Sequence, residues 1–433
     1  MTASLTICGL SCICMILSIL FFPRVRIGRW GVDTYWLIVS AGAAIMIING
    51  QIDISAVISS LLADTAINPL KILVLFVSMT ILSIFLDELG FFAYLANKAL
   101  TLAGKSQFRL FLILYITVSV LTVFTSNDII ILTFTPFICY FAKNAEISPI
   151  PYLVAQFVAA NTWSMMLVIG NPTNIYLATA YDVDFVSYLR IMAFPTFAAG
   201  TVAFVVLWLI FRKKLSLPLV PHVAVIKIKD KLLLTVGIIH LSVCTVTLAV
   251  GSYIGAQMWV ISLLSAVSLF VFTSVISAFR HRYPSQLVSC LRRAPWQLVP
   301  FVVSMFILIL ALAEHGVTQW ISNALGNGAT VWKYGIVSML SANVINNIPM
   351  SVLFCSVIEF TSATCRTGAV YAAVVGSNLG ALVTPIGALA GIIWTMILKN
   401  HGVKFGYWDF IKYGVAVSVP AAAAAFGALY IVL

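Results

Sequence analysis

Charged side chains are scarce in this sequence of 433 residues. Only 9% of the residues are Asp, Glu, Lys or Arg, whereas 62% are hydrophobic and the mean hydropathy is +1.09. A soluble domain carries about 25% charged residues, so the composition excludes a water-soluble fold. Apolar runs long enough to cross a bilayer as helices recur along the chain, and the short alternating strands of a membrane barrel are absent. We therefore predict an all-α polytopic membrane protein, because helices satisfy their own backbone polar groups in lipid.

The sequence also lacks the motifs of two enzyme classes and of a zinc centre. It contains no His-Glu-x-x-His, so an intramembrane zinc protease would have no ligands. It contains no Gly-x-x-x-x-Gly-Lys loop, so the chain cannot drive itself with ATP, although a separate cytosolic ATPase subunit stays open as a partner. The eight cysteines form no Cys-x-x-Cys pair. We expect no enzymatic activity and no cofactor, and any metal ligand stays unknown.

The apolar runs fall into two sets of five candidate spans. They lie near 5–22, 33–50, 70–87, 150–180 and 191–211, and near 232–250, 257–278, 299–314, 368–398 and 408–432. Between the third and fourth span of each set lies a further apolar stretch, at 107–143 and 331–361, with polar residues at its middle. Each stretch is either a pair of spanning helices or a re-entrant hairpin with its tip inside the protein. The short first arm and the near absence of a loop favour the hairpin.

Positive charge predicts the orientation. If both stretches are hairpins, one side of the membrane receives only Lys71, Arg190, Lys333 and Arg366. The opposite side then receives the remaining 20 of the 24 Lys and Arg, which identifies it as cytoplasmic. Both termini are therefore expected outside, in a cell (inner or plasma) membrane, and residues 213–230 are expected to form a cytoplasmic linker. Loop charge explains the net charge of +11, so we predict no nucleic-acid partner.

The two halves of the chain resemble each other at one constant offset. Ser78, Met79, Glu88, Gly90 and Asn97 correspond to Ser304, Met305, Glu314, Gly316 and Asn323. Because five spans per half is an odd number, the halves must have opposite orientations in the membrane. Inverted repeats with broken helices near the midplane are a design of secondary transporters.

Polar residues gather at the hairpin tips and in the helix that follows each hairpin. The candidate substrate or ion site comprises Ser126, Asn127, Asp128, Asn161, Thr162, Gly170, Asn171, Thr173, Asn346, Asn347, Ser377, Asn378, Thr384 and Gly387. Pro and Gly beside these residues indicate broken helices, whose freed amides can hold an anion and whose freed carbonyls can hold a cation. The alternative is a pair of kinked helices in which Asn and Thr join neighbours. Matching breaks in both halves favour a site.

Asp128 is the candidate coupling residue. An acid at membrane depth is costly and marks a functional position by default. Asp128 suits a proton or Na⁺ coupling site, or a neutral oxyacid substrate. The alternative is that Asp128 is the N-cap of the returning helix, and both roles are compatible. Glu88 and Glu314 each lie at the end of a span beside Gly, where an acid is commonly structural.

The order of these motifs resembles a known family. The stretch from Gly376 to Trp394, with Ser-Asn-Asp at 126–128 and Asn-Asn-Ile-Pro at 346–349, is similar to the arsenical pump membrane proteins. These are arsenite and antimonite efflux permeases of the ion transporter superfamily, and the resemblance covers nearly the whole chain. Citrate and dicarboxylate transporters of that superfamily usually have Ser-Asn-Thr at the tips, where this chain has Asp128 and Asn346-Asn347.

The resemblance implies an elevator-like division of the chain and a transported solute. Residues 1–106 and 231–329 would form a scaffold, and 107–212 and 330–433 would form a mobile transport unit. The implied activity is proton-coupled efflux of arsenite, antimonite or a similar small inorganic ion or oxyacid, with H⁺ or Na⁺ as the coupling ion. A Na⁺- or proton-coupled carboxylate transporter, a Na⁺/H⁺ antiporter and an ion channel stay open as alternatives. Membrane lipid is an expected partner, and a homodimer stays open.

Overall fold

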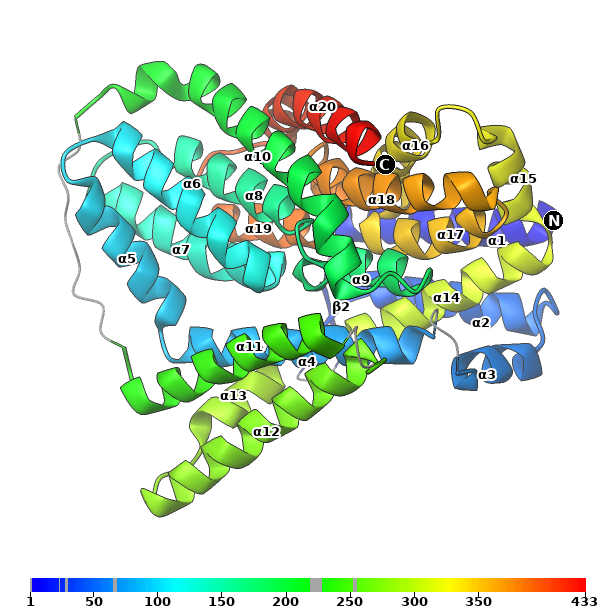
Figure 1. Ribbon diagram of the computed structural model, residues 1–433, viewed down its shortest axis with the longest axis horizontal. Helices are drawn as coiled ribbons and strands as arrows, with labels where there is room; N and C mark the ends of the chain where they lie inside the picture. The colour runs from blue at the N-terminus through cyan, green and yellow to red at the C-terminus, as the bar shows by residue number, and fades with distance from the viewer. Residues whose placement is uncertain (1, 23, 28–29, 65–67, 219–227, 252–254) are drawn as a thin grey trace.

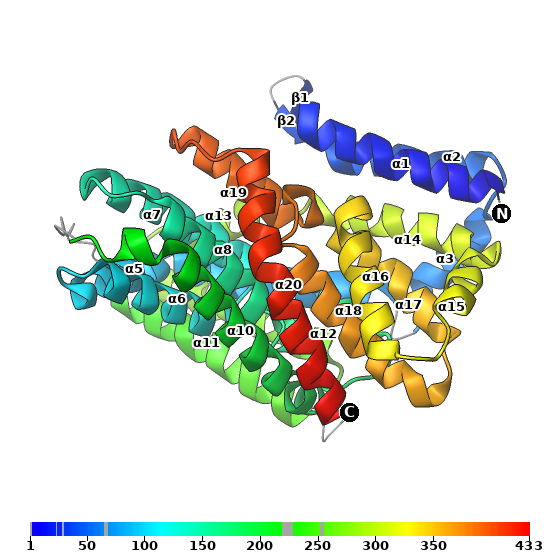
Figure 2. The ribbon, with the colours of Figure 1, turned by 90° about the horizontal axis from the view of Figure 1, so that it is seen from above.

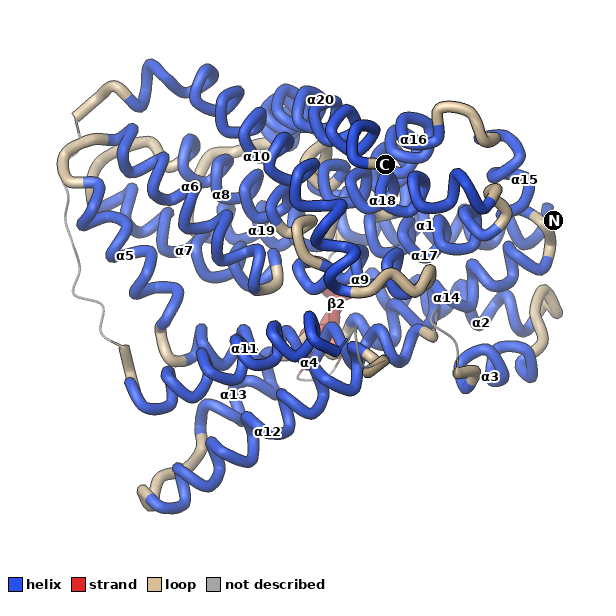
Figure 3. Tube along the Cα trace, viewed as in Figure 1, coloured by secondary structure: helices blue, strands red, loops and turns tan. Residues whose placement is uncertain are grey.

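The computed structural model describes residues 2–22, 24–27, 30–64, 68–218, 228–251 and 255–433. Most of these described residues are helical (Figure 3). The first half contains α1 (Thr2–Phe21), α2 (Thr34–Ile48), α3 (Ile54–Leu62), α4 (Pro69–Glu88), α5 (Phe91–Ala103), α6 (Gln107–Phe124), α7 (Asn127–Asn144), α8 (Ile150–Trp163), η1 (Val168–Gly170), α9 (Pro172–Thr179) and α10 (Phe185–Leu215). The second half contains α11 (Lys231–Gly251), α12 (Met258–Phe279), α13 (Ser285–Arg293), α14 (Leu298–Glu314), α15 (Val317–Leu325), α16 (Thr330–Ile345), α17 (Asn347–Glu359), α18 (Ala363–Gly380), η3 (Pro385–Gly387), α19 (Leu389–Asn400) and α20 (Tyr407–Val432). The predicted all-α class is confirmed.

Long apolar helices make up most of the predicted spans. Within the described residues, eight helical segments are long and apolar enough to cross a membrane: α1, α4, α6, α10, α11, α12, α13 together with α14, and α20. Three predicted spans are not among these segments. The span at 33–50 contains α2, which has only 15 residues. The spans at 150–180 and 368–398 each consist of two helices joined by a short 3₁₀ turn. An integral membrane protein with many helices is therefore supported, whereas the number of crossings stays a prediction.

Several short elements were not anticipated from the sequence. Strands β1 (Arg24–Ile27) and β2 (Trp30–Asp33) pair antiparallel, with Arg24 opposite Asp33, and the Arg24 Nε donates to the Asp33 carboxylate at 2.7 Å. The helices α3, α5, α13 and α15 connect the longer ones. These segments are too short to give a span-length apolar run, so the sequence pattern did not separate them from loops.

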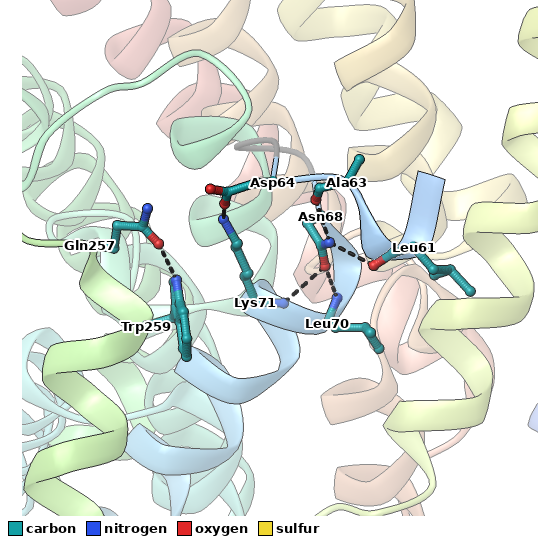
Figure 4. A network of polar contacts seen from close by, with 8 residues as sticks. All are labelled: Leu61, Ala63, Asp64, Asn68, Leu70, Lys71, Gln257 and Trp259. Atoms are coloured by element: carbon teal, nitrogen blue, oxygen red, sulfur yellow. Dashed lines mark hydrogen bonds and ion pairs between the residues drawn. The ribbon is translucent and has the colours of Figure 1, made fainter. Parts of the chain in front are cut away.

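The start of α4 is fixed by a polar cap (Figure 4). The side-chain oxygen of Asn68 accepts from the amides of Leu70 and Lys71, at 2.9 and 3.3 Å. Its amide group donates to the carbonyls of Leu61 and Ala63, at 2.7 and 2.8 Å. Pro69 occupies the first helical position, where no backbone donor is needed. Asn68 thus holds the end of α3 against the beginning of α4.

The elements of the two halves are packed into each other. Figures 1 and 2 show α5–α8 gathered at one end of the molecule and α15–α17 at the other, with α9, α18 and α19 between them. In the first half α7 packs against α19 of the second half, and in the second half α17 packs against α9 of the first. In the same way α4 packs against α12, and α14 packs against α2. This exchange places the two broken helices side by side at the centre.

Candidate functional site

Both predicted tips are junctions between two helices in the protein interior. Only Thr125 and Ser126 separate α6 from α7, and only Asn346 separates α16 from α17. Asn346 has φ of 73° and ψ of 154°, a strained backbone conformation that residues with a side chain rarely adopt. The side chains of Ser126, Asn127, Asn346 and Asn347 are all buried. The polar interruptions were therefore predicted correctly, whereas re-entry from one side of a membrane stays a prediction.

The helix breaks lie slightly later in the chain than predicted. Asn161, Thr162, Ser377 and Asn378 were expected to interrupt their helices, but they lie within the last turns of α8 and α18. The reason is that Asn161 donates to the Phe157 carbonyl at 2.9 Å and Asn378 donates to the Val374 carbonyl at 2.8 Å. Each side chain is bonded to its own preceding turn, which is compatible with an intact helix. The irregular backbone begins after Trp163 and after Gly380.

A glycine closes each break. A β-carbon at Gly170 would lie 2.2 Å from the Ser164 carbonyl oxygen, and one at Gly387 would lie 2.8 Å from the Gly380 carbonyl oxygen. Both distances are far below normal contact, and the clashing atoms belong to backbone that cannot rotate away. The chain therefore folds back on the end of the preceding helix in the same way in both halves. This explains why Gly170 and Gly387 stand at these positions.

Asn378 on α18 joins the broken helix of the first half to that of the second. Its side-chain oxygen accepts from the Asn171 amide group at 2.9 Å and lies 2.9 Å from the Ser164 hydroxyl. Its amide group donates to the Asn174 side-chain oxygen at 2.7 Å. All these groups are buried, so the contacts replace water rather than compete with it. The two halves of the chain are thus connected by polar contacts at their breaks.

The first tip belongs to the same cluster. The Asn127 amide group donates to the Asn161 side-chain oxygen at 3.2 Å. The Ser164 hydroxyl, which also contacts Asn378, lies 2.8 Å from the Asn161 carbonyl. The structure therefore brings Asn127, Asn161 and Asn378 into one buried polar cluster with the first break.

The second tip is bonded to the second break. Asn346 donates to the Ile386 carbonyl at 2.9 Å, and the Thr384 hydroxyl donates to the Asn343 side-chain oxygen at 2.7 Å. Asn343 also donates to the Gly380 carbonyl at 3.0 Å, at the end of α18. These hydrogen bonds of the candidate site thus form two clusters, one at each helix break.

Sequence reasoning missed three members of these clusters: Ser164, Asn174 and Asn343. Asn174 directly follows the candidate residue Thr173, and Asn343 lies one turn before Asn346. Asn343 could have been found from helical spacing, because residues one turn apart lie on the same face of a helix. Nothing in the sequence distinguishes Ser164 from a serine that packs between helices.

Four buried hydroxyl groups of the candidate site have no hydrogen-bond partner in the described protein. They belong to Ser126, Thr162, Thr173 and Ser377. A buried polar group without a partner costs about 1–3 kcal/mol, and nearly all such groups in native proteins are satisfied. Buried groups without a partner also occur among the described residues outside the candidate site, so these four hydroxyls are free to contact a solute, ion or water but do not by themselves define a site.

Asp128 lies in the first turn of α7 and is half-buried. Ser126 is the N-cap position and Asn127 begins the helix, so the alternative that Asp128 is the cap is wrong. The positive end of the helix dipole stabilises a carboxylate there. Among the described residues, no Lys, Arg or His forms an ion pair with Asp128. Within the part of the chain that the structure describes, its carboxylate therefore has no fixed counter-ion.

The acids at the end of α4 have a different environment. Arg293 of α13 donates to Glu88 and to Asp87, in both cases at 2.6 Å. Asp87 also accepts from the Thr133 hydroxyl of α7 at 2.8 Å. Glu88 is thus part of an ion-pair cluster that holds α13 against α4, which supports the structural interpretation for this residue.

Comparison with known proteins identifies relatives over most of the chain. The sequence model of the family CitMHS, described as "Citrate transporter", matches residues 34–370. The arsenical pump membrane protein of Escherichia coli (strain K12) is 28% identical over 366 residues, which cover 80% of this chain and 82% of that protein. The arsenical pump membrane protein of Yersinia enterocolitica is 27% identical with the same coverage.

Proposed function

This chain belongs to the citrate transporter family CitMHS and is a membrane transporter, and from that premise we propose that it exports arsenite or antimonite in exchange for protons. The names of the relatives support this choice of substrate. The same names support the expectation that the chain is not an enzyme.

The observation that carries the proposal is the chemistry of the central clusters. Apart from Asp128, the predicted site residues are uncharged, and they offer amide groups and unpartnered hydroxyls. Arsenous and antimonous acids are neutral hydroxides in water near pH 7, with oxygen atoms that both donate and accept hydrogen bonds. A buried site without Lys or Arg favours a neutral cargo over a polyanion, whose burial without a cation is very costly.

The same framework supports a mechanism based on two inverted repeats with re-entrant hairpins. Glu88 and Glu314 end α4 and α14, and the following Gly90 and Gly316 share a left-handed backbone, with φ of 82° and 73°. The packing of α7 on α19 and of α17 on α9 also follows the correspondence between the two repeats. In this mechanism the hairpins, broken helices, α10 and α20 move together against the scaffold of residues 1–106 and 231–329. The linker at 213–230 lies partly outside the described residues, which omit 219–227.

The second candidate function is Na⁺- or proton-coupled transport of a carboxylate. The family description favours it, and the freed amides at the starts of α9 and α19 could face a carboxylate. In that case the coupling cations, held by Asp128 and neighbouring oxygens, would have to neutralise the substrate. An ion channel needs no second conformation, so exchange of labelled substrate across the membrane distinguishes it from both transporters.

A resistance assay tests the function. The chain is expressed in a bacterium without its own arsenite pump, and growth is measured on arsenite, antimonite, high Na⁺, and citrate as carbon source. We expect growth at higher arsenite and antimonite concentrations than an empty-vector strain tolerates. Growth on citrate alone, with arsenite sensitivity unchanged, would establish the second candidate instead.

Orientation predicts a pattern of thiol labelling. In a variant with Cys365 as its sole cysteine, a membrane-impermeant maleimide should label intact cells, because Cys365 adjoins Arg366 on the side expected to be external. A cysteine introduced as Ser216→Cys, at the exposed end of α10 after Lys213 and Lys214, should react only in permeabilised cells. Labelling of Ser216→Cys in intact cells would reverse the proposed orientation.

Loss of the bond between Thr133 and Asp87 should release α7 from α4. Thr133→Val keeps the side-chain shape but removes a hydrogen bond to a carboxylate, which is worth about 1.5–3 kcal/mol. We expect the native Cys139 thiol of α7, which is buried here, to react about tenfold faster with a small thiol reagent. Thr135→Val is the matched control, because Thr135 contacts the Ile131 carbonyl and Gln156 within the transport unit. Equal rates in both variants would refute α7 movement against α4.

A further inference from the structure

An apolar groove of about 490 Å³ runs between α4 and α12 on the scaffold. Its walls contain Leu73, Val77, Val267 and Val271, and its lining exposes almost no polar surface. Leu291 of α13 and Trp296, which follows α13, also line it. Val267 and Val271 are about half exposed, so the groove opens outward from the protein. Figure 1 shows α12 and α13 at the lower edge of the molecule.

The chain segment that contains Leu291 and Trp296 is rich in arginine. Residues 231–313 contain no Asp or Glu, yet Arg280, Arg282, Arg292 and Arg293 stand close together in this segment. Arg280 is paired with Asp230, and Arg293 is paired with Asp87 and Glu88. Arg282 and Arg292 are exposed and form no ion pair with any described residue. Two cationic side chains are thus available for an anion.

Aromatic side chains place this corner at a membrane surface. Phe279, Tyr283 and Trp296 are exposed around the arginines, with Tyr283 76% accessible. Exposed aromatic rings combined with arginines are typical of the level of lipid headgroups. The Trp296 indole donates to the Leu291 carbonyl at 2.6 Å, which fixes the ring at the mouth of the groove. The wall of the groove formed by Leu291 and Trp296 is therefore part of a chain segment with exposed cations and aromatic rings.

We propose that this corner is a binding site for one anionic phospholipid. An acyl chain occupies the groove between α4 and α12, and the headgroup phosphate contacts Arg292, which directly follows the groove-lining Leu291. Arg282, before the start of α13, adds positive charge to the same surface. Charge complementarity decides the occupant, because a zwitterionic lipid would fill the groove equally well but gain less from unpaired arginines. The site lies on the scaffold, and its existence does not depend on the transported substrate.

A photo-crosslinkable phosphatidylglycerol tests this site on the full-length protein in lipid nanodiscs. With a diazirine on the acyl chain, crosslinked peptides should map to α4 and α12, and the phosphatidylcholine analogue should label them far less. The double variant Arg282→Gln/Arg292→Gln should need roughly 10- to 30-fold more phosphatidylglycerol for equal labelling. Val267→Trp, at an exposed position, should block labelling of the groove by either lipid.

The control is Arg109→Gln/Lys412→Gln, which removes two exposed cations from α6 and α20 and should leave labelling unchanged. Equal labelling by both lipids, or no effect of the arginine variant, would overturn the proposal. Efficient disulfide formation between two copies of a Val271→Cys variant would also overturn it, because the groove would then be an interface between copies of this chain.

Discussion

Replacing Asp128 with Asn is expected to abolish gradient-driven transport while the protein stays folded. Asn has nearly the same size as Asp, and Ser126 occupies the cap position, so no helix cap is lost. The stability cost is limited to the loss of a charge at the start of α7, which is worth about 0.3–1 kcal/mol. Asn can neither release a proton nor offer a full negative charge to Na⁺. A large functional effect should therefore accompany a small structural one.

The measurement is net arsenite flux in membrane vesicles under an imposed pH or Na⁺ gradient, together with the thermal stability of the purified protein. Asp53→Asn, which changes an exposed acid at the start of α3, is the matched control and should transport normally. If Asp128→Asn retains an unchanged gradient dependence, Asp128 does not couple transport. Glu314 would then be the next candidate, because Glu88 is held by Arg293.

Two neighbouring residues on α18 should respond in opposite ways to replacement by Ala. Asn378→Ala should strongly lower the thermal stability and the amount of folded protein. It leaves the Asn171 amide group and the Asn174 side-chain oxygen without their partner. Each buried polar group that loses its partner costs about 1–3 kcal/mol. Transport should be lost with the fold.

Ser377→Ala removes a buried hydroxyl that has no partner, so stability should stay unchanged or rise slightly. Substrate affinity should instead fall, by about tenfold for one lost hydrogen bond of roughly 1.4 kcal/mol. Arsenite-dependent protection of the purified protein against heating measures this affinity. If Ser377→Ala binds arsenite normally, the unpartnered hydroxyl does not contact the substrate. If Asn378→Ala is as stable as the wild type, the contacts between the halves are not structural.

Local patterns predicted the elements of the site better than their connections. The interruptions at Ser126-Asn127 and Asn346-Asn347 were visible because polar residues stood inside apolar runs of known length. The end of α8 could not be located in the same way, because a side-chain bond to the preceding turn keeps Asn161 helical. The partners of Asn378 could not be predicted, since they depend on packing between distant segments. The short connecting helices were missed because none of them is long enough to show a clear periodic pattern.

The contacts of Asn378 also determine when the protein can be completed during synthesis. Asn171 lies 207 residues before Asn378, and translation proceeds at about 5–20 residues per second. The polar break of the first half must therefore wait roughly 10–40 s for its partner. During that interval the Asn171 amide group and the Asn174 side-chain oxygen lack the partner that Asn378 provides in the folded protein. We therefore expect the first half to be less stable than the full chain, and it should not persist when expressed alone.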